Sequence, residues 1–310
     1  MIDWAVVLTP LLVLPIVLLF RFIGCGELHG APEETIPPTN QYRDHILANP
    51  DVIAYWRLID PEKSNSASDE KGAWNGDYRV ASLADEPPTA TTGGSHVATG
   101  QILTGLPSLI TLEPAVPGRD FDGGFVVISD KFTSTPANAH LYTEEFTIEA
   151  WVKPTPTFVP DYEYTLFQAI GTYRRPNETD QTAHGFSLFA NRQGSWQAVL
   201  APHPDVLFPS PPYVPLVKSH VAFTVQKTAA GQVQAQLFVN GAPSEAVTIS
   251  FYSPPHGAFL LIGAANKNAD PSVNPPVPRQ PFLGQIQEVV LYKKALEAKD
   301  IFRHFKNFPS

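Results

Sequence analysis

Apolar and polar side chains alternate along several segments of this chain, and this alternation constrains its fold more than any other feature. Every second side chain is apolar in residues 146–153 (FTIEAWVK), and the same holds in residues 221–225 and 233–239. Successive side chains of a β-strand point to opposite faces, so each segment is predicted to be a strand with one buried face. The third segment ends at Asn240-Gly241, which is typical of a type I′ hairpin because both turn positions need a positive φ.

Proline content and the remaining strand segments point to the same class of fold. The chain holds 32 prolines, about double the usual ~5% share. Helices and central strands rarely tolerate proline, which predicts many ordered loops. Five further strands are predicted, at residues 125–128, 186–190, 196–200, 259–262 and 286–292. Many strands with long turns and little helix indicate an all-β, antiparallel sandwich or barrel.

Two short helices are expected at the ends of this domain. The first covers residues 41–48, with Asn40 as its N-cap. The second covers residues 295–305 near the C-terminus and is expected to bury four apolar side chains. These are Leu296, Ile301, Phe302 and Phe305.

The N-terminal segment WAVVLTPLLVLPIVLLF carries no charged side chain. A helix over residues 4–23 would be about 30 Å long, which matches the hydrocarbon thickness of a bilayer. We therefore predict a single transmembrane helix, or membrane anchor, in residues 1–25. Its aromatic and basic ends suit the two interfaces, and membrane helices tolerate its two prolines. These anchor residues are Trp4, Arg21, Pro10 and Pro15.

Two alternatives to an uncleaved helix remain open. The segment Phe22-Ile23-Gly24-Cys25 resembles a lipobox, which would make Cys25 a lipidation site, although Arg21 stands where that motif is normally uncharged. A cleaved signal peptide would need a positively charged start, and Met1-Ile2-Asp3 offers only the α-amino group. The single cysteine also means that no internal disulfide is expected.

A short linker separates the predicted anchor from the rest of the chain. Residues 26–40 (GELHGAPEETIPPTN) contain three prolines, and proline-rich linkers are stiff and extended. The domain is therefore expected to stand close to the membrane. Residues 41–310 show no repeat and no change in composition that would divide them, which predicts one domain.

Nine segments after residue 40 occur in the order that is found in bacterial laminin-G-like domains. They are residues 42–48 (YRDHILA), 54–58 (AYWRL), 121–123 (FDG), 146–154 (FTIEAWVKP), 220–225 (HVAFTV), 237–241 (LFVNG), 261–264 (LIGA), 282–289 (FLGQIQEV) and 291–296 (LYKKAL). On these motifs the chain resembles the laminin-G-like family of concanavalin A-like jelly rolls. The resemblance implies a β-sandwich and favours the periplasmic or extracellular side of the membrane for residues 41–310.

Many members of that family carry a structural calcium ion, and here its residues are changed. The usual Leu-Asp-Glu after Tyr-Trp-Arg is Leu58-Ile59-Asp60, and Gln287 replaces an aspartate of the Gly-x-Ile-Asp-Glu strand. Calcium prefers charged oxygen ligands, so both changes should weaken the site. We expect no cofactor, with calcium as the one alternative. Its candidate ligands are Asp60, Asp69 and Glu288.

The sequence carries no recognisable signature of catalysis or of nucleic-acid binding. Glycosidases of this fold class use carboxylate pairs on one strand face, whereas Glu149 and Glu288 have no carboxylate two residues away on either side. The nine histidines show no metal-ligand spacing. A net charge of −9 without a basic cluster argues against nucleic acid. We expect a protein that is not an enzyme.

Aromatic side chains are the remaining candidates for a binding surface. Trp74, Phe208 and Tyr213 are candidates, and the last two belong to the loop FPSPPYVP, whose prolines would hold an apolar surface rigidly. Trp196 lies in a strand pattern and is expected in the core. The favoured function is a membrane-anchored accessory subunit that contacts lipid and other integral membrane subunits. The alternative is a lectin-like adhesion protein that binds glycans or a surface polymer.

Overall fold

The computed structural model describes fourteen stretches of the chain, all within the compact unit Ile36–Ser310. They are residues 39–61, 64–82, 90–92, 97–98, 108–110, 122–129, 141–154, 164–173, 182–191, 194–201, 214–255, 257–266, 276–282 and 284–307. Among these residues, no helix has the length and apolar character needed to span a bilayer. The predicted anchor, the linker up to residue 38 and Cys25 lie outside the described residues.

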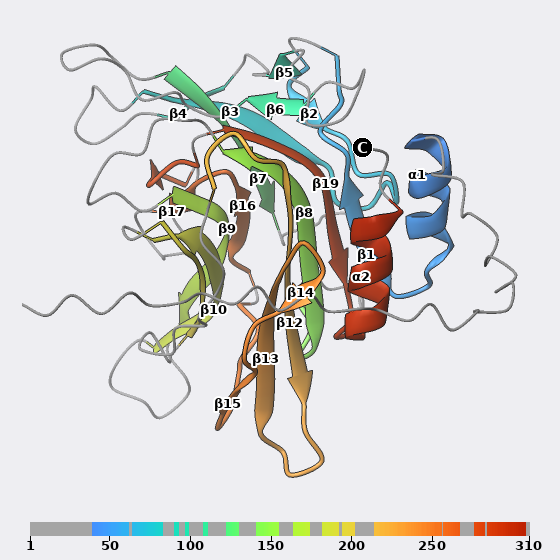
Figure 1. Cartoon of the computed structure of the whole chain (residues 1–310). Coiled ribbons are helices and arrows are strands. Elements are labelled where there is room, and N and C mark those ends of the chain that lie inside the picture. Colours follow the sequence, from blue (N-terminus) through green and yellow to red (C-terminus); the bar gives the residue numbers. More distant parts are fainter. Residues whose placement is uncertain are drawn as a thin grey trace, which may run out of the picture. The chain divides into compact units, whose positions relative to one another are not determined.

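Two antiparallel sheets face each other, as the resemblance to laminin-G-like domains implied (Figure 1). The first sheet has the order β14 (Ala242–Pro243), β13 (Val233–Val239), β12 (Ser219–Lys227), β8 (Phe146–Pro154), β19 (Gly284–Tyr292), β6 (Ser108–Ile110) and β5 (Val97–Ala98), with β1 (Val52–Trp56) beside β19 and β15 (Val247–Ile249) beside β13. The second has the order β11 (Trp196–Ala201), β10 (Thr182–Ala190), β9 (Tyr164–Tyr173), β16 (Phe259–Ile262), β7 (Asp122–Ser129), β3 (Gly76–Ser82) and β2 (Ser66–Ala67), with β4 (Ala90–Thr92) beside β3. A separate small hairpin joins β17 (Ala265–Asn266) and β18 (Pro278–Arg279).

The predicted apolar faces form the core between the two sheets. Phe146, Ile148, Ala150 and Val152 of β8 are all buried in one cluster with residues of the second sheet. Val221 pairs with Ala150 and with Val239, so these inward side chains line up across three strands. Alternation therefore predicted both the strands and the side of each strand that is buried.

The predicted hairpin at Asn240-Gly241 is also confirmed. Both residues have a positive φ, 52° and 74°, and β14 turns back to pair with the end of β13. The amide of Asn240 donates to the carbonyl of His220 at 2.8 Å, and its side chain accepts from the amide of His220 at 2.8 Å. Asn240 thus ties the turn to the neighbouring strand β12.

Two helices lie beside each other and cover the outer face of the first sheet (Figure 1). Helix α1 spans Thr39–Ala48, so Asn40 lies inside it and the predicted N-cap was wrong. Helix α2 spans Ala298–Lys306 and begins three residues later than expected. Ile301 is buried as predicted, but Phe302 is 48% exposed because the buried side of α2 runs through Ile301 and His304.

A β-bulge in β19 changes which side chains reach this outer face. Gln287 pairs with Trp151 and Val290 with Glu149, so β19 has one more residue than β8 between these pairs. Glu288, at the bulge, has a φ of 54°. The extra residue lets Gln287 and Glu288 both lie outside the sandwich core, while Val289 returns to it.

Candidate functional site

A concentration of buried polar groups lies between the first sheet and the two helices. We call this region the helix-covered layer. Its apolar members are Tyr42, Ile46, Val52, Tyr55, Trp151, Ala222, Phe238, Val290, Tyr292, Leu296 and Ile301. Buried polar or charged side chains lie between them, among them Arg57, Glu149, His220, Glu288 and His304. These polar side chains come from four strands or strand ends and one helix, so only the folded sheet brings them together.

Glu149 of β8 is fully buried and is the centre of one polar cluster. It accepts a hydrogen bond from the Tyr292 hydroxyl at 2.6 Å, and His304 Nδ1 lies 2.9 Å from the same oxygen. The Nε2 atom of His220 lies 3.3 Å from the other carboxylate oxygen. The contact with His304 joins helix α2 to the centre of the sheet.

The charges of this cluster stabilise one another. Burial alone would raise the pKa of Glu149, but His304 and His220 outweigh it and hold that pKa well below its usual range. Burial alone would lower the pKa of His304, but Glu149 outweighs it and raises that pKa. Each group therefore favours the charged form of the other, an ionised Glu149 carboxylate and a protonated His304.

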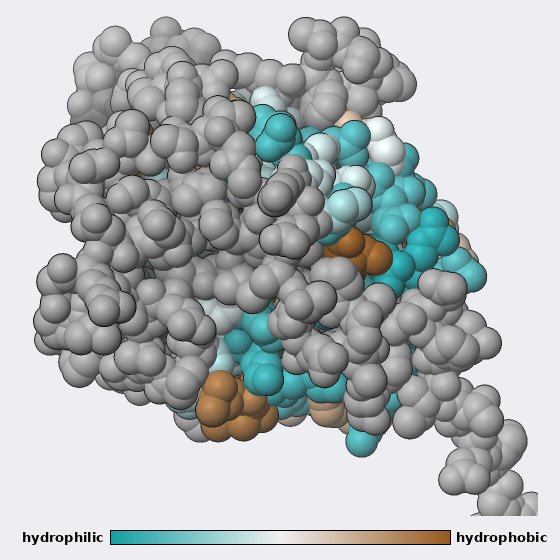
Figure 2. Space-filling view, turned by 90° about the horizontal axis from the view of Figure 1, so that it is seen from above, coloured by the Kyte–Doolittle hydropathy of each residue, from teal (hydrophilic) through white to brown (hydrophobic). Residues whose placement is uncertain are grey.

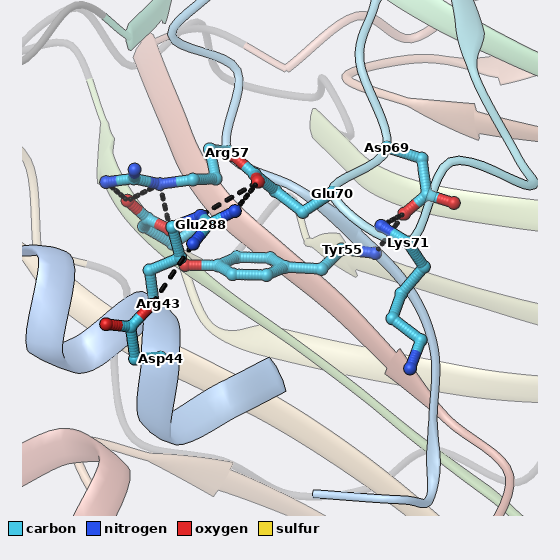
Figure 3. A network of polar contacts seen from close by, with 8 residues as sticks. All are labelled: Arg43, Asp44, Tyr55, Arg57, Asp69, Glu70, Lys71 and Glu288. Atoms are coloured by element: carbon cyan, nitrogen blue, oxygen red, sulfur yellow. Dashed lines mark hydrogen bonds and ion pairs between the residues drawn. The ribbon is translucent and has the colours of Figure 1, made fainter. Parts of the chain in front are cut away.

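A second cluster surrounds Glu288 (Figure 3). Its carboxylate lies 3.2 Å from the guanidinium of Arg57 and accepts a hydrogen bond from the Tyr55 hydroxyl. Burial is the largest influence on Glu288 and raises its pKa, and Arg57 and Tyr55 offset this only in part. The neighbouring Leu58 has a φ of 57°. Two residues in the left-handed region, Leu58 and Glu288, thus lie where the strands β1 and β19 meet.

Asp69 organises the loop that follows β2. Its carboxylate accepts four backbone hydrogen bonds, of 2.8 to 3.0 Å, and is itself 5% exposed. One donor is the amide of Tyr55, whose ring reaches Glu288 in the opposite direction (Figure 3). The other donors are the amides of Lys71, Ala73 and Trp74.

The three candidate calcium ligands occupy separate environments. Asp60 accepts from the Tyr78 hydroxyl at 2.7 Å and from the Ser68 amide. Asp69 and Glu288 contact opposite ends of one tyrosine, as described above. Within the described part of the chain, no group of three His, Cys, Asp or Glu side chains is arranged to hold a metal ion. The structure therefore does not bring Asp60, Asp69 and Glu288 together as one ligand set.

The chain was compared with protein-family models and with proteins of known structure. The family model described as the concanavalin A-like lectin/glucanases superfamily matches residues 129–302, more than half of the chain. The chain belongs to this superfamily. The resemblance deduced from the strand motifs is thereby confirmed. No curated protein matches the sequence.

Solved structures that are similar to this chain include sialidases and one domain of an arabinanase. Trypanosoma rangeli sialidase in complex with sialic acid is 14% identical with a TM-score of 0.53, and the match covers 86% of this chain and 37% of that one. A mutant of the same sialidase that displays trans-sialidase activity is 14% identical with a TM-score of 0.52, and the match covers 87% of this chain and 38% of that one. The third structure is domain 4 of AbnA, a GH43 extracellular arabinanase from Geobacillus stearothermophilus, in complex with arabinotriose. It is 15% identical with a TM-score of 0.43, and the match covers 82% of this chain and 98% of that one. This chain spans about a third of the sialidase chains it matches, and the likeness shows the fold.

In this member of the superfamily the two buried carboxylates are enclosed by protein. Glu149 is 0% and Glu288 is 1% exposed. A catalytic carboxylate must contact its substrate or a water molecule, and in this structure the surroundings of both groups are tyrosine, histidine and arginine side chains. The arrangement is suited to fastening α2 and β1 to the sheet.

The aromatic binding candidates had different outcomes. Trp74 is 2% exposed and belongs to the core, where its carbonyl accepts from the indole of Trp56 at 2.6 Å, so the prediction of a surface aromatic was wrong. The sequence around Trp74 did not show that the loop after β2 folds inward around the Asp69 carboxylate. Trp196 is buried as predicted. Phe208 and Tyr213 lie outside the described residues.

The described end of the proline-rich loop is exposed and apolar. Val214, Leu216 and Val217 are 44%, 56% and 46% exposed. Hydrophilic side chains predominate among the coloured residues of Figure 2, where hydrophobic ones form small patches. The amide of Leu216 donates to the carbonyl of Pro154 at 2.9 Å, and Leu216 has a φ of 61°. We call Val214–Val217 the apolar turn. The hydrogen bond holds this turn at the end of β8, and at Leu216 the backbone adopts a conformation that residues other than glycine rarely adopt.

The residues of the Glu149 cluster were missed by the sequence analysis. Glu149 was considered only as half of a carboxylate pair, and His220 and His304 only as scattered histidines. One signal was present, because Thr147, Glu149 and Trp151 share the face of β8 opposite to the core face. A charged residue beside a tryptophan on that face indicates that another layer covers it. The sequence could not show which residues contact Glu149, because its partners His220 and His304 lie 71 and 155 residues further along the chain.

Proposed function

We propose that the protein is a non-catalytic, membrane-anchored interaction module. In this proposal residues 1–25 form a single transmembrane helix, and the sandwich lies on the periplasmic or extracellular side as an accessory subunit of a membrane protein complex. The apolar segment of residues 4–23 supports the anchor. Membership of a superfamily that hosts binding modules as well as enzymes is compatible with it, since one fold supports many functions.

The apolar turn is the observation that carries the docking part of this proposal. Three of its four residues are aliphatic and about half exposed. When a partner covers such exposed aliphatic side chains, the burial of apolar surface stabilises the complex by about 25 cal/mol per Å². The turn is fastened to Pro154, so little conformational entropy would be lost on binding. A neighbouring membrane subunit is the proposed partner.

Gentle detergent extraction followed by sizing tests this function. The native chain is expected to elute in a complex larger than its own 33.9 kDa plus a micelle. The variant Leu216→Asp should release it from that complex, because an aspartate would be buried without a partner. Phe251→Asp is the matched control, since Phe251 is also an exposed apolar residue, at 39%. A lone native chain, or equal behaviour of both variants, would contradict the docking role.

Recognition of carbohydrate is the second candidate function, and superfamily membership favours it. A glycan array probed with the detergent-solubilised full chain, with and without calcium, distinguishes the two. Specific glycan binding that Leu216→Asp leaves unchanged would favour the lectin-like function. Dependence on calcium would bring Asp60, Asp69 and Glu288 back as candidate ligands, through a rearrangement of their present contacts.

A further inference from the structure

A continuous row of aromatic and basic side chains runs from the first sheet onto α2. Trp151 of β8 stacks on Phe305 with ring centroids 5.9 Å apart, and Phe305 lies 6.4 Å from Phe302. The Nζ atom of Lys306 lies 5.6 Å from the centroids of both phenylalanine rings. The Nζ atom of Lys218 lies 5.2 Å from the Trp151 ring. We call these five residues the aromatic–lysine row.

The two lysines of this row differ from the other cations around α2. Lys299 is paired with Glu297 at 2.6 Å and Arg303 with Asp300 at 3.4 Å. By contrast, the polar contacts that the structure gives Lys218 and Lys306 are with aromatic rings. Burial lowers the pKa of Lys218, and within the described part of the chain no carboxylate offsets this lost hydration. An anion arriving from outside would supply the missing charge.

The aromatic side chains of the row become more exposed from Trp151 on the sheet to Phe302 on α2. Phe302 is 48% exposed, whereas Trp151 is 2% exposed. The last turn of α2 carries Arg303, His304 and Lys306, and its acidic residue, Asp300, is in the first turn. Exposed aromatic rings beside lysines on one helix face are typical of segments that lie at the interface of a bilayer.

We propose that the aromatic–lysine row rests on the phosphate headgroups of an anionic membrane. This inference rests on the proposed function, because the anchor would hold the domain at the bilayer. The chain enters the domain through α1, which packs beside α2 with the rings of His45 and His304 5.6 Å apart. The end of the linker and the row therefore belong to the same helical layer. A protein of net charge −9 would otherwise be repelled by an anionic surface, so a local basic face decides its orientation.

Lysine footprinting of the full chain in nanodiscs tests this proposal. An amine-acetylating reagent is applied to the chain in discs of phosphatidylcholine alone and in discs that also contain phosphatidylglycerol. Lys218 and Lys306 are expected to react about fivefold more slowly in the anionic discs, since each basic side chain near such a surface contributes attraction of that order. Lys227, at the other end of β12 and 46% exposed, is the internal control and should react equally in both.

Substitutions separate lipid contact from a general change in structure. Lys306→Gln should restore about fivefold reactivity at Lys218 in anionic discs, by the same attraction per lysine. Lys227→Gln should leave it unchanged, and high salt should abolish the difference between the two lipids. Equal reactivity of Lys218 and Lys306 in both discs would overturn the proposal. So would protection that appears only when a membrane protein extract is added, because the occupant would then be a protein.

The same experiment distinguishes this failure from failure of the proposed function. A chain that is not retained in either disc lacks the anchor, and both proposals then fall. A chain that is retained but shows equal reactivity overturns only the lipid contact.

Discussion

Replacing Glu149 with glutamine tests the central cluster of the helix-covered layer. The two side chains have the same shape, but glutamine offers one acceptor oxygen and a donor nitrogen. In the native protein the carboxylate serves both the Tyr292 hydroxyl at 2.6 Å and His304 Nδ1 at 2.9 Å. Both contacts are with one carboxylate oxygen, which the amide oxygen of Glu149→Gln can replace. The substitution instead removes the negative charge beside His304 and puts an amide NH2 group where the other oxygen lies, 3.3 Å from His220 Nε2.

The magnitude follows from the burial of these groups. Hydrogen bonds to a charged group contribute about 1.5–3 kcal/mol, and a stranded buried donor costs about 1–3 kcal/mol. Breaking a buried ion pair costs about 3–5 kcal/mol. His304 can relieve part of this cost by losing its proton, so we expect Glu149→Gln to lower the free energy of unfolding by about 2–4 kcal/mol near pH 6.

The cost should depend on pH. The pKa of folded His304 is raised above its usual 6.5, so its contribution to stability is complete below 6.5 and is lost as pH rises through the raised pKa. The pKa of folded Glu149 is lowered below its usual 4.5, so its contribution is present above 4.5 and is lost as pH falls through the lowered pKa. Native stabilisation by the pair is therefore greatest between 4.5 and 6.5. The difference between native protein and Glu149→Gln should shrink in alkali.

Urea denaturation of the full chain in detergent, followed by tryptophan fluorescence at pH 6 and pH 9, measures this difference. Glu144→Gln is the matched control, because Glu144 is 62% exposed and pairs with Lys227 at the surface; it should change stability by less than about 0.5 kcal/mol. A cost below about 1 kcal/mol for Glu149→Gln at pH 6, or an equal cost at pH 9, would refute the reasoning.

Three further substitutions probe other parts of the fold by thermal unfolding. Tyr252→Phe should leave stability unchanged or raise it by about 1 kcal/mol, because its buried hydroxyl has no hydrogen-bond partner in the described part of the chain; a clear loss would reveal one. Asp69→Asn should cost about 2–3 kcal/mol, since an amide cannot accept all four backbone donors, and an unchanged midpoint would contradict this role. Gly284→Ala should cost about 2–4 kcal/mol, because φ is 140° and the new methyl group meets the Lys153 carbonyl; a neutral result would show that the strands can separate there.

Local patterns were sufficient for eight of the strands and for the hairpin, but they did not identify β1, β3 or β9. In β8 the alternation named the four residues that point into the core, and Asn240-Gly241 named the turn. The helix boundaries were less exact, because an N-cap at Asn40 was inferred from residue type while α1 begins at Thr39. Phe302 was assigned to the core because it is apolar, but the surface it would cover is occupied by Ile301 and His304.

The sequence by itself determined that this chain is an antiparallel all-β protein, since alternation, turn residues and proline are local properties that act within a few residues; the choice of a sandwich over a barrel came from the resemblance of its strand motifs to a known family. Only the tertiary structure decided that the outer face of the first sheet is buried as well. That decision depends on contacts such as Glu149 with His304, which are 155 residues apart. It also depends on the bulge that turns Glu288 outward. Neither the depth at which a carboxylate lies nor its partner is a local property, because both arise from the packing of helices onto the finished sheet.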